Sequence, residues 1–85
     1  MFEVRVTADA RNQISGLPLP IQARIQHVIE RLARWPSVSG AKPLRGALKG
    51  SFRIRTGGYR VLFSVDARRE RVEVFRVADR RDVYE

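Results

Sequence analysis

The stretch Gly50–Val65, GSFRIRTGGYRVLFSV, alternates apolar and polar residues on both sides of a glycine pair and predicts a β-hairpin. Gly57 and Gly58 suit a two-residue type I′ loop, in which both positions take a positive φ that glycine adopts without steric cost. A loop of this length sets the register of the two strands. The opposed pairs predicted from it are Thr56–Tyr59, Arg55–Arg60, Ile54–Val61, Arg53–Leu62 and Phe52–Phe63.

This register gives the hairpin one apolar face and one basic face. The apolar face carries Phe52, Ile54, Val61 and Phe63, and the basic face carries Arg53, Arg55 and Arg60. The like charges of the directly opposed Arg55 and Arg60 cost about 0.2–1 kcal/mol relative to neutral partners. Because folding gains nothing from this pair, we expect the basic face to be a functional site for a phosphate-rich ligand.

Composition limits the classes of protein and of site. The 85 residues predict a single domain, 1–85, and the absence of cysteine excludes disulfides and thiolate chemistry. A single histidine, His27, excludes a paired-histidine nuclease and a metal cluster, so we expect no cofactor and no metal. We find neither a signal peptide nor an apolar run of membrane-spanning length, and therefore expect a cytoplasmic protein with no membrane partner.

The positive charge is concentrated in one part of the chain. The formal net charge is +8, and between Glu30 and Asp66 there are eight basic residues and no acidic one. Such a concentrated field favours nucleic acid or an acidic protein as the partner.

The remaining chain predicts an α+β fold. We expect a strand at 2–6, a helix at 7–15 ending near Gly16, a second helix from Pro20 to about Arg34, and a central antiparallel strand at 72–78. The segment 37–50 is expected to be mainly a connector with an edge segment around 42–45, and 79–85 a helical turn capped by Asp79. A small antiparallel sheet, made of the N-terminal strand and a three-stranded meander, then packs on two N-terminal helices in the order β-α-α-β-β-β. The apolar stripe of the second helix covers the apolar face of the hairpin and leaves the basic face open.

Some residues have simpler interpretations. We expect His27 to be a polar side chain on the helix surface, and Trp35 to anchor the end of the helix in the core. The carboxylates Asp66, Glu70 and Glu73 fall in or beside a loop, where we expect them to be solvating charges.

The arginines suit a reaction that needs mainly positioning and charge stabilisation, such as attack of an RNA 2′-hydroxyl on its adjacent phosphate. Arginine hardly deprotonates, so Tyr84 is the best candidate for the base, with its pKa of about 10 lowered by neighbouring positive charge. In the expected C-terminal turn, Tyr84 stands at i,i+4 from Arg80. We expect Lys42, Arg45 and Lys49 to join Arg53 and Arg55 in binding RNA phosphates.

Three blocks of sequence resemble the RelE/ParE superfamily of bacterial toxins, and specifically its RelE-type branch. They are KPLRG at 42–46, GSFRIRTGGYRVLF at 50–63 and VADRRDVY at 77–84. The resemblance implies the toxin of a type II toxin–antitoxin pair, acting as a ribosome-dependent, metal-independent mRNA endoribonuclease that leaves a 2′,3′-cyclic phosphate. The implied partners are the ribosome with its mRNA and an acidic antitoxin encoded beside the toxin.

The resemblance also implies roles for individual residues. Arg53 and Arg55 match positions that orient and neutralise the RNA backbone, and Arg60 matches an arginine that stabilises the transition state. Arg80 matches an arginine assigned to the leaving group, and Tyr84 a tyrosine assigned to the nucleophile and to base stacking. Two alternatives stay open: a ParE-like inhibitor of DNA gyrase without nuclease activity, and an RNA-binding module that has lost catalysis.

Overall fold

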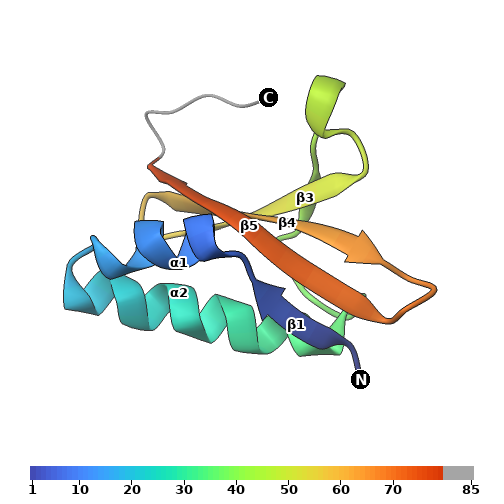
Figure 1. The fold of residues 1–85 in the computed structure, drawn as a ribbon, viewed down its shortest axis with the longest axis horizontal. Coiled ribbons are helices and arrows are strands. Elements are labelled where there is room, and N and C mark those ends of the chain that lie inside the picture. Colours follow the sequence, from blue (N-terminus) through green and yellow to red (C-terminus); the bar gives the residue numbers. More distant parts are fainter. Residues whose placement is uncertain (80–85) are drawn as a thin grey trace.

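The computed structural model of the protein describes residues 1–79 as two helices on one side of a five-stranded sheet (Figure 1). The helices are α1 (Ala8–Ser15) and α2 (Leu19–Arg31), and α2 continues into the 3₁₀ turn η1 (Leu32–Arg34). The strands are β1 (Glu3–Val6), β2 (Lys42–Pro43), β3 (Ser51–Thr56), β4 (Tyr59–Asp66) and β5 (Arg71–Asp79), with a second 3₁₀ turn, η2 (Gly46–Leu48), between β2 and β3. This architecture confirms the predicted α+β fold. No helix within residues 1–79 is long and apolar enough to cross a membrane.

The strand order across the sheet is β1-β5-β4-β3-β2. The pairs β2–β3, β3–β4 and β4–β5 are antiparallel, whereas β1 pairs with β5 in parallel. The sheet is therefore mostly antiparallel. The edge segment expected around 42–45 is present as the short edge strand β2. Parallel neighbours need a long connection, and the two helices and strands β2, β3 and β4 supply it between β1 and β5.

The hairpin of β3 and β4 has the register predicted from its loop. The five predicted pairs are all present, from Thr56–Tyr59 to Phe52–Phe63. Gly57 and Gly58 take φ values of 55° and 82°, as a type I′ loop requires.

A register shift in β5 changes which of its side chains face the helices. Leu62 of β4 pairs with Arg76, but the next residue, Phe63, pairs with Val74, so Phe75 is an extra residue in β5. A β-bulge of this kind reverses the alternation of side chains beyond it. Val77 consequently lies in the core with Val72 and Val74.

The bulge is supported from the first helix. The side-chain Oε1 of Gln13 accepts a hydrogen bond from the backbone N–H of Val77 at 2.7 Å. At this point β1 has ended, since its last pair is Val6–Val74, and the Gln13 amide oxygen takes the place of a neighbouring strand.

The core lies between the helices and the apolar face of the sheet. Ile25, Val28, Ile29 and Leu32 of α2 and η1 are buried against strand residues that include Ile54, Val61 and Phe63. The ring of Trp35 contacts those of Phe52 and Phe63, with centroids 4.7 and 5.5 Å apart, which confirms its expected role as a core anchor.

Both helices begin much as their sequences predict. Thr7 caps α1, because its Oγ1 accepts the backbone N–H of Ala10 at 3.2 Å, and Gly16 follows the last helical residue. Helix α2 begins at Leu19, so that Pro20 lies in its first turn, where a missing N–H costs no hydrogen bond. His27 is exposed on α2, as expected.

Candidate functional site

The face of the sheet turned away from the helices carries two rows of residues that run across the strands. Directly opposed residues share a face, so each row can be followed from strand to strand. The first row is Lys42, Arg53, Leu62 and Arg76, and the second is Arg55, Arg60 and Ala78. Five of these side chains are basic and none is acidic. We call Lys42, Arg53, Arg55, Arg60 and Arg76 the basic face.

The basic face stands on a small apolar floor. Leu62 is 1% exposed and Ala78 4% exposed, although both lie on the side of the sheet opposite the helices. Arg53, Arg60 and Arg76 are half-buried, and the Nε atom of Arg60 is buried. Long basic side chains can cover apolar surface with their stems while the charged ends stay near water. Contact with the apolar Leu62 and Ala78 thus limits the conformations of these arginine side chains before any ligand binds.

The end of the hairpin is hollowed next to the second row. A hollow of about 410 Å³ is lined by residues of the hairpin end, among them Arg55, Tyr59 and Arg60. Opposed side chains in a sheet start about 4.5–5.5 Å apart at Cβ, so the guanidinium groups of Arg55 and Arg60 can reach the same anion. Such paired forks match the geometry of a phosphate group.

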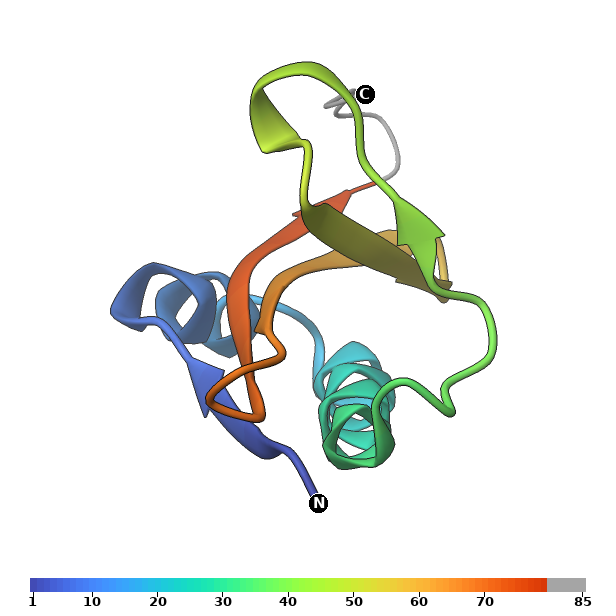
Figure 2. The same ribbon diagram turned by 90° about the vertical axis from the view of Figure 1, so that its right-hand side faces the viewer.

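The segment between β2 and β3 stands on the same side of the sheet as the basic face. Figure 2 shows its turn η2 projecting from the sheet, while α1 and α2 lie on the opposite side. Arg45 and Lys49 flank η2 directly and are both exposed. These two predicted phosphate-binding residues therefore lie beside the rows and are not members of them.

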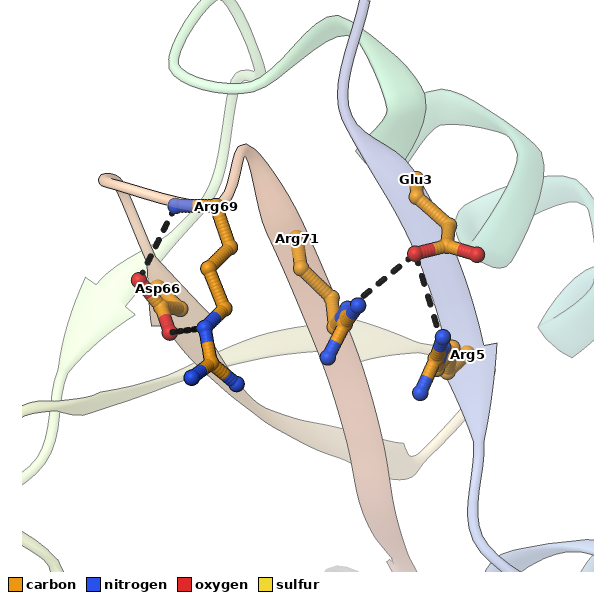
Figure 3. A network of polar contacts seen from close by, with 5 residues as sticks. All are labelled: Glu3, Arg5, Asp66, Arg69 and Arg71. Atoms are coloured by element: carbon orange, nitrogen blue, oxygen red, sulfur yellow. Dashed lines mark hydrogen bonds and ion pairs between the residues drawn. The ribbon is translucent and has the colours of Figure 1, made fainter.

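At the other end of this sheet face, acidic residues form ion pairs with arginines (Figure 3). The carboxylate of Glu3 accepts a hydrogen bond from Nε of Arg71 at 3.1 Å and lies 3.4 Å from Nε of Arg5. The hydrogen bond from Arg71, followed by the charge of Arg5, holds the pKa of Glu3 below its usual value of 4.5. Asp66, the last residue of β4, pairs with Arg69 of the following turn, with 3.8 Å between its Oδ2 and Nε of Arg69. The basic field is consequently strongest over β2, β3 and the first half of β4.

The structure brings together some of the predicted site residues. Arg53, Arg55 and Arg60 share one face as predicted, and Lys42 joins them through its pairing with Arg53. The predicted C-terminal residues Arg80 and Tyr84 lie outside the described residues. Asp79, predicted to cap a helical turn, is the last residue of β5 and pairs with Tyr59, and the rest of that turn lies beyond the described part of the chain.

Arg76 is a residue of the basic face that sequence reasoning missed. Strict alternation along VEVFRVA would place Arg76 on the core face with Val72 and Val74. The bulge at Phe75 turns it to the opposite face instead. The spacing of the three valines, 72, 74 and 77, is the signal that could have indicated the bulge.

The chemistry available on the basic face is anion binding and charge stabilisation. Arginine stays protonated, so the four arginines of the basic face can bind an anion but cannot accept a proton from an attacking group. Within residues 1–79, no group of three or more His, Asp or Glu side chains is placed to hold a metal ion.

Comparison with known proteins shows the family of the chain. A family model for the ParE toxin of the type II toxin–antitoxin system parDE matches residues 4–84. The toxins RelG and RelE of Mycobacterium tuberculosis are 38% and 36% identical to the chain over 84 residues, which is 98% of the chain and 95% and 86% of the two toxins.

Solved structures agree with this assignment. The toxin–antitoxin complex RelBE2 from Mycobacterium tuberculosis contains a chain that superposes with a TM-score of 0.82 at 36% identity, covering 93% of this chain and 98% of that one. The isolated RelE toxin of E. coli superposes with a TM-score of 0.78 at 17% identity, over 100% of this chain and 89% of that one, and shows the shared fold. The sequence relatives and the family model together show that the chain belongs to the RelE/ParE family of toxins from type II toxin–antitoxin systems.

Proposed function

We propose that this toxin is a ribosome-dependent mRNA endoribonuclease. The observation that carries the proposal is the basic face, in which five cations stand in two adjacent rows over an apolar floor with no acidic residue among them. Like charges opposed across a sheet do not stabilise the fold. A phosphodiester backbone would neutralise the positive charges of the basic face.

In the proposed reaction the 2′-oxygen of a nucleotide attacks the adjacent phosphorus. The 2′-O–P bond forms, the P–O5′ bond breaks, and the products carry a 2′,3′-cyclic phosphate and a 5′-hydroxyl. The 2′-hydroxyl proton leaves to a base, and a proton is delivered to the departing 5′-oxygen. Arg53 and Arg55 orient the RNA backbone, and Arg60 stabilises the additional negative charge on the phosphorus-bound oxygens.

In the proposed mechanism, Arg80 and Tyr84 near the C-terminus carry out the proton transfers. By resemblance to the family, Tyr84 accepts the 2′-hydroxyl proton or stacks on a base, and Arg80 acts at the leaving group. The arginines of the basic face cannot replace Tyr84 as the base, because a guanidinium group stays protonated at any physiological pH.

A second candidate is inhibition of DNA gyrase without nuclease activity. The observation in its favour is the family model, which describes a ParE toxin. We favour the nuclease because a toxin that acts by protein binding has no need of two guanidinium groups, those of Arg55 and Arg60, in the lining of one hollow. The sequence relatives found are toxins named RelG and RelE.

The proposed inhibitor is an acidic antitoxin of the RelB type. Relatives of this fold have been crystallised as RelB complexes from Mycobacterium tuberculosis, E. coli and Pyrococcus horikoshii. An acidic segment laid over the basic face would neutralise it and exclude RNA at the same time.

The test is a cleavage assay on purified ribosomes that carry a defined mRNA. Primer extension should reveal cuts at the codon in the A site with the wild-type protein, and cuts should be lost with Arg60→Ala. The matched control is Arg68→Ala, which removes one arginine from the turn after β4 and should cleave like the wild type. Circular dichroism and antitoxin binding should show that Arg60→Ala is folded.

A gyrase assay in parallel separates the two candidates. Intact mRNA together with DNA breaks that depend on gyrase would falsify the nuclease proposal. An uncut message without gyrase inhibition, together with retained binding to RNA, would identify a toxin that has lost catalysis and binds RNA only.

A further inference from the structure

A second basic hollow lies between α2 and the end of the hairpin. Its volume is about 310 Å³, and its lining includes Arg24, His27 and Arg31 from α2 and Arg55 and Thr56 from β3. None of the described residues that line it is acidic. We call these five residues the α2 hollow.

The basic residues of α2 follow one side of the helix. Arg24, His27 and Arg31 are spaced by three and four residues, so their side chains are neighbours on the helix surface. Arg24 and Arg31 supply guanidinium groups, and the imidazole of His27 between them supplies a further hydrogen-bonding group. The arrangement suits an anionic ligand.

Two of these arginines are held in place by the protein. The guanidinium group of Arg31 donates hydrogen bonds to the backbone oxygen of Ser39 at 2.8 Å and to its Oγ at 3.1 Å. The side chain of Arg24 lies against the hairpin loop, where a Cβ on Gly57 would stand 3.0 Å from its Nη1 atom. The missing side chain of Gly57 leaves the room that Arg24 occupies.

The α2 hollow adjoins the hollow at the basic face, because Arg55 and Thr56 at the end of β3 line both. An RNA chain that leaves the basic face at Arg55 reaches further cations on α2 without crossing an acidic residue of either lining.

We propose that the α2 hollow is a second binding site for the RNA backbone, separate from the phosphate that is cut. It contributes affinity and orientation and takes no part in bond breaking. The site rests on the proposed function, because it binds RNA beside the basic face at which the mRNA is cut.

The lining of the α2 hollow favours RNA over an acidic protein segment. Its apolar lining consists of Ala23 and Val28, which give a peptide no large side chain to pack against. A groove of about 380 Å³ between β1, α1 and α2 has Val6, Ile14 and Ile29 in its lining and offers a protein partner the apolar contacts that the α2 hollow lacks. Guanidinium and hydroxyl groups without apolar anchors match phosphates and riboses.

The test measures how RNA affinity depends on salt. Fluorescence anisotropy follows binding of the full chain to a short single-stranded RNA whose 2′-hydroxyls are methylated, so that it cannot be cut, at salt concentrations between about 50 and 200 mM. Each phosphate contact to single-stranded RNA contributes about 0.7 to the slope of log K against log salt concentration. The double variant Arg24→Gln/Arg31→Gln should therefore lower the slope by about 1.4.

The charge-matched control is Arg68→Gln/Arg69→Gln. It removes the same two charges from the turn at the opposite end of β4 and should leave the slope unchanged. Because Arg31 is tied to Ser39, the single variant Arg24→Gln, with an expected loss of about 0.7 in the slope, keeps the test valid if the double variant is unstable.

The same measurement on ribosomes with an empty A site identifies the source of the RNA. If the α2 variant lowers the salt slope with both the short RNA and ribosomes, the α2 hollow contacts single-stranded mRNA. If the variant lowers the slope with ribosomes alone, the hollow contacts ribosomal RNA. Equal losses for the α2 variant and its control, or no loss in either assay, would overturn the proposal. So would normal RNA binding with weakened antitoxin binding, which would identify a protein-docking surface.

Failure of this site and failure of the proposed function have different signatures. If the wild type cleaves mRNA but Arg24→Gln shows the wild-type salt slope with both the short RNA and ribosomes, the α2 site is wrong and the nuclease stands. If the wild type never cleaves but the slope falls as expected, the α2 site stands and the nuclease is wrong.

Discussion

Replacing Arg55 by glutamine should make the protein more stable and less active. Arg55 is opposed to Arg60 across the hairpin, and like charges in this position cost about 0.2–1 kcal/mol. The side chain of Arg55 is exposed, so its truncation loses little packing, whereas Arg60 has a buried Nε atom and would lose more. Since 1 kcal/mol corresponds to about 4–8 °C for a domain of this size, Arg55→Gln should raise Tm by about 1–8 °C.

The expected loss of activity is larger than the gain in stability. A hydrogen bond to a charged group contributes about 1.5–3 kcal/mol, so loss of one guanidinium contact to the RNA phosphate should slow cleavage about 10- to 100-fold. Cleavage is measured on ribosomes that carry a defined mRNA, and stability by urea unfolding at neutral pH.

Two further measurements identify repulsion as the cause. The gain in stability should shrink in 1 M salt, where the Debye length falls to about 3 Å from about 10 Å at 0.1 M. It should also shrink when Arg60 is already replaced by glutamine, because the double-mutant cycle isolates the coupling between the two charges. Arg68→Gln is the control for a change of net charge alone.

Some results would refute the reasoning. If Arg55→Gln lowers both stability and activity, Arg55 has a structural role that the register does not reveal. If the gain in stability is the same at high salt and in the Arg60→Gln background, it does not come from the opposed charges.

Two other predictions concern groups that hold the sheet. Gln13→Leu should lower the free energy of unfolding by about 1–3 kcal/mol, because it leaves the buried N–H of Val77 without its acceptor, whereas Gln13→Glu keeps an acceptor oxygen and should lose less in urea unfolding. Equal losses for both variants would show that the hydrogen bond does not matter. The lowered pKa of Glu3 means that its ion pairs stabilise the fold at pH above 4.5, and that this contribution is lost as pH falls through the depressed value. Glu3→Gln should accordingly lower the urea midpoint at pH 7 and lower it less at pH 3, and a deficit of the same size at both pH values would contradict this account.

The hairpin could be predicted from the sequence because its information is local. Two glycines fix the loop type, the loop fixes the register, and the register decides which side chains share a face. The placement of Arg53, Arg55 and Arg60 on one face required no knowledge of the rest of the chain. The helices were predictable for a similar reason, since Thr7, Gly16 and Pro20 mark their ends within a few residues.

Only the tertiary structure decided the positions of three further features. Arg76 reaches the basic face because the bulge at Phe75 interrupts the alternation of β5, and Gln13, far away in sequence, binds the strand just beyond that bulge. Arg24 meets Gly57 only because α2 packs beneath the hairpin. The parallel pairing of β1 with β5 likewise depends on how the helices return the chain. The sequence by itself determined the register of the hairpin and the face that its arginines share, because one turn and two adjacent strands decide both. The bulge, the contact of Arg24 with Gly57 and the pairing of β1 with β5 join residues that are distant in the chain, so they depend on how whole elements pack.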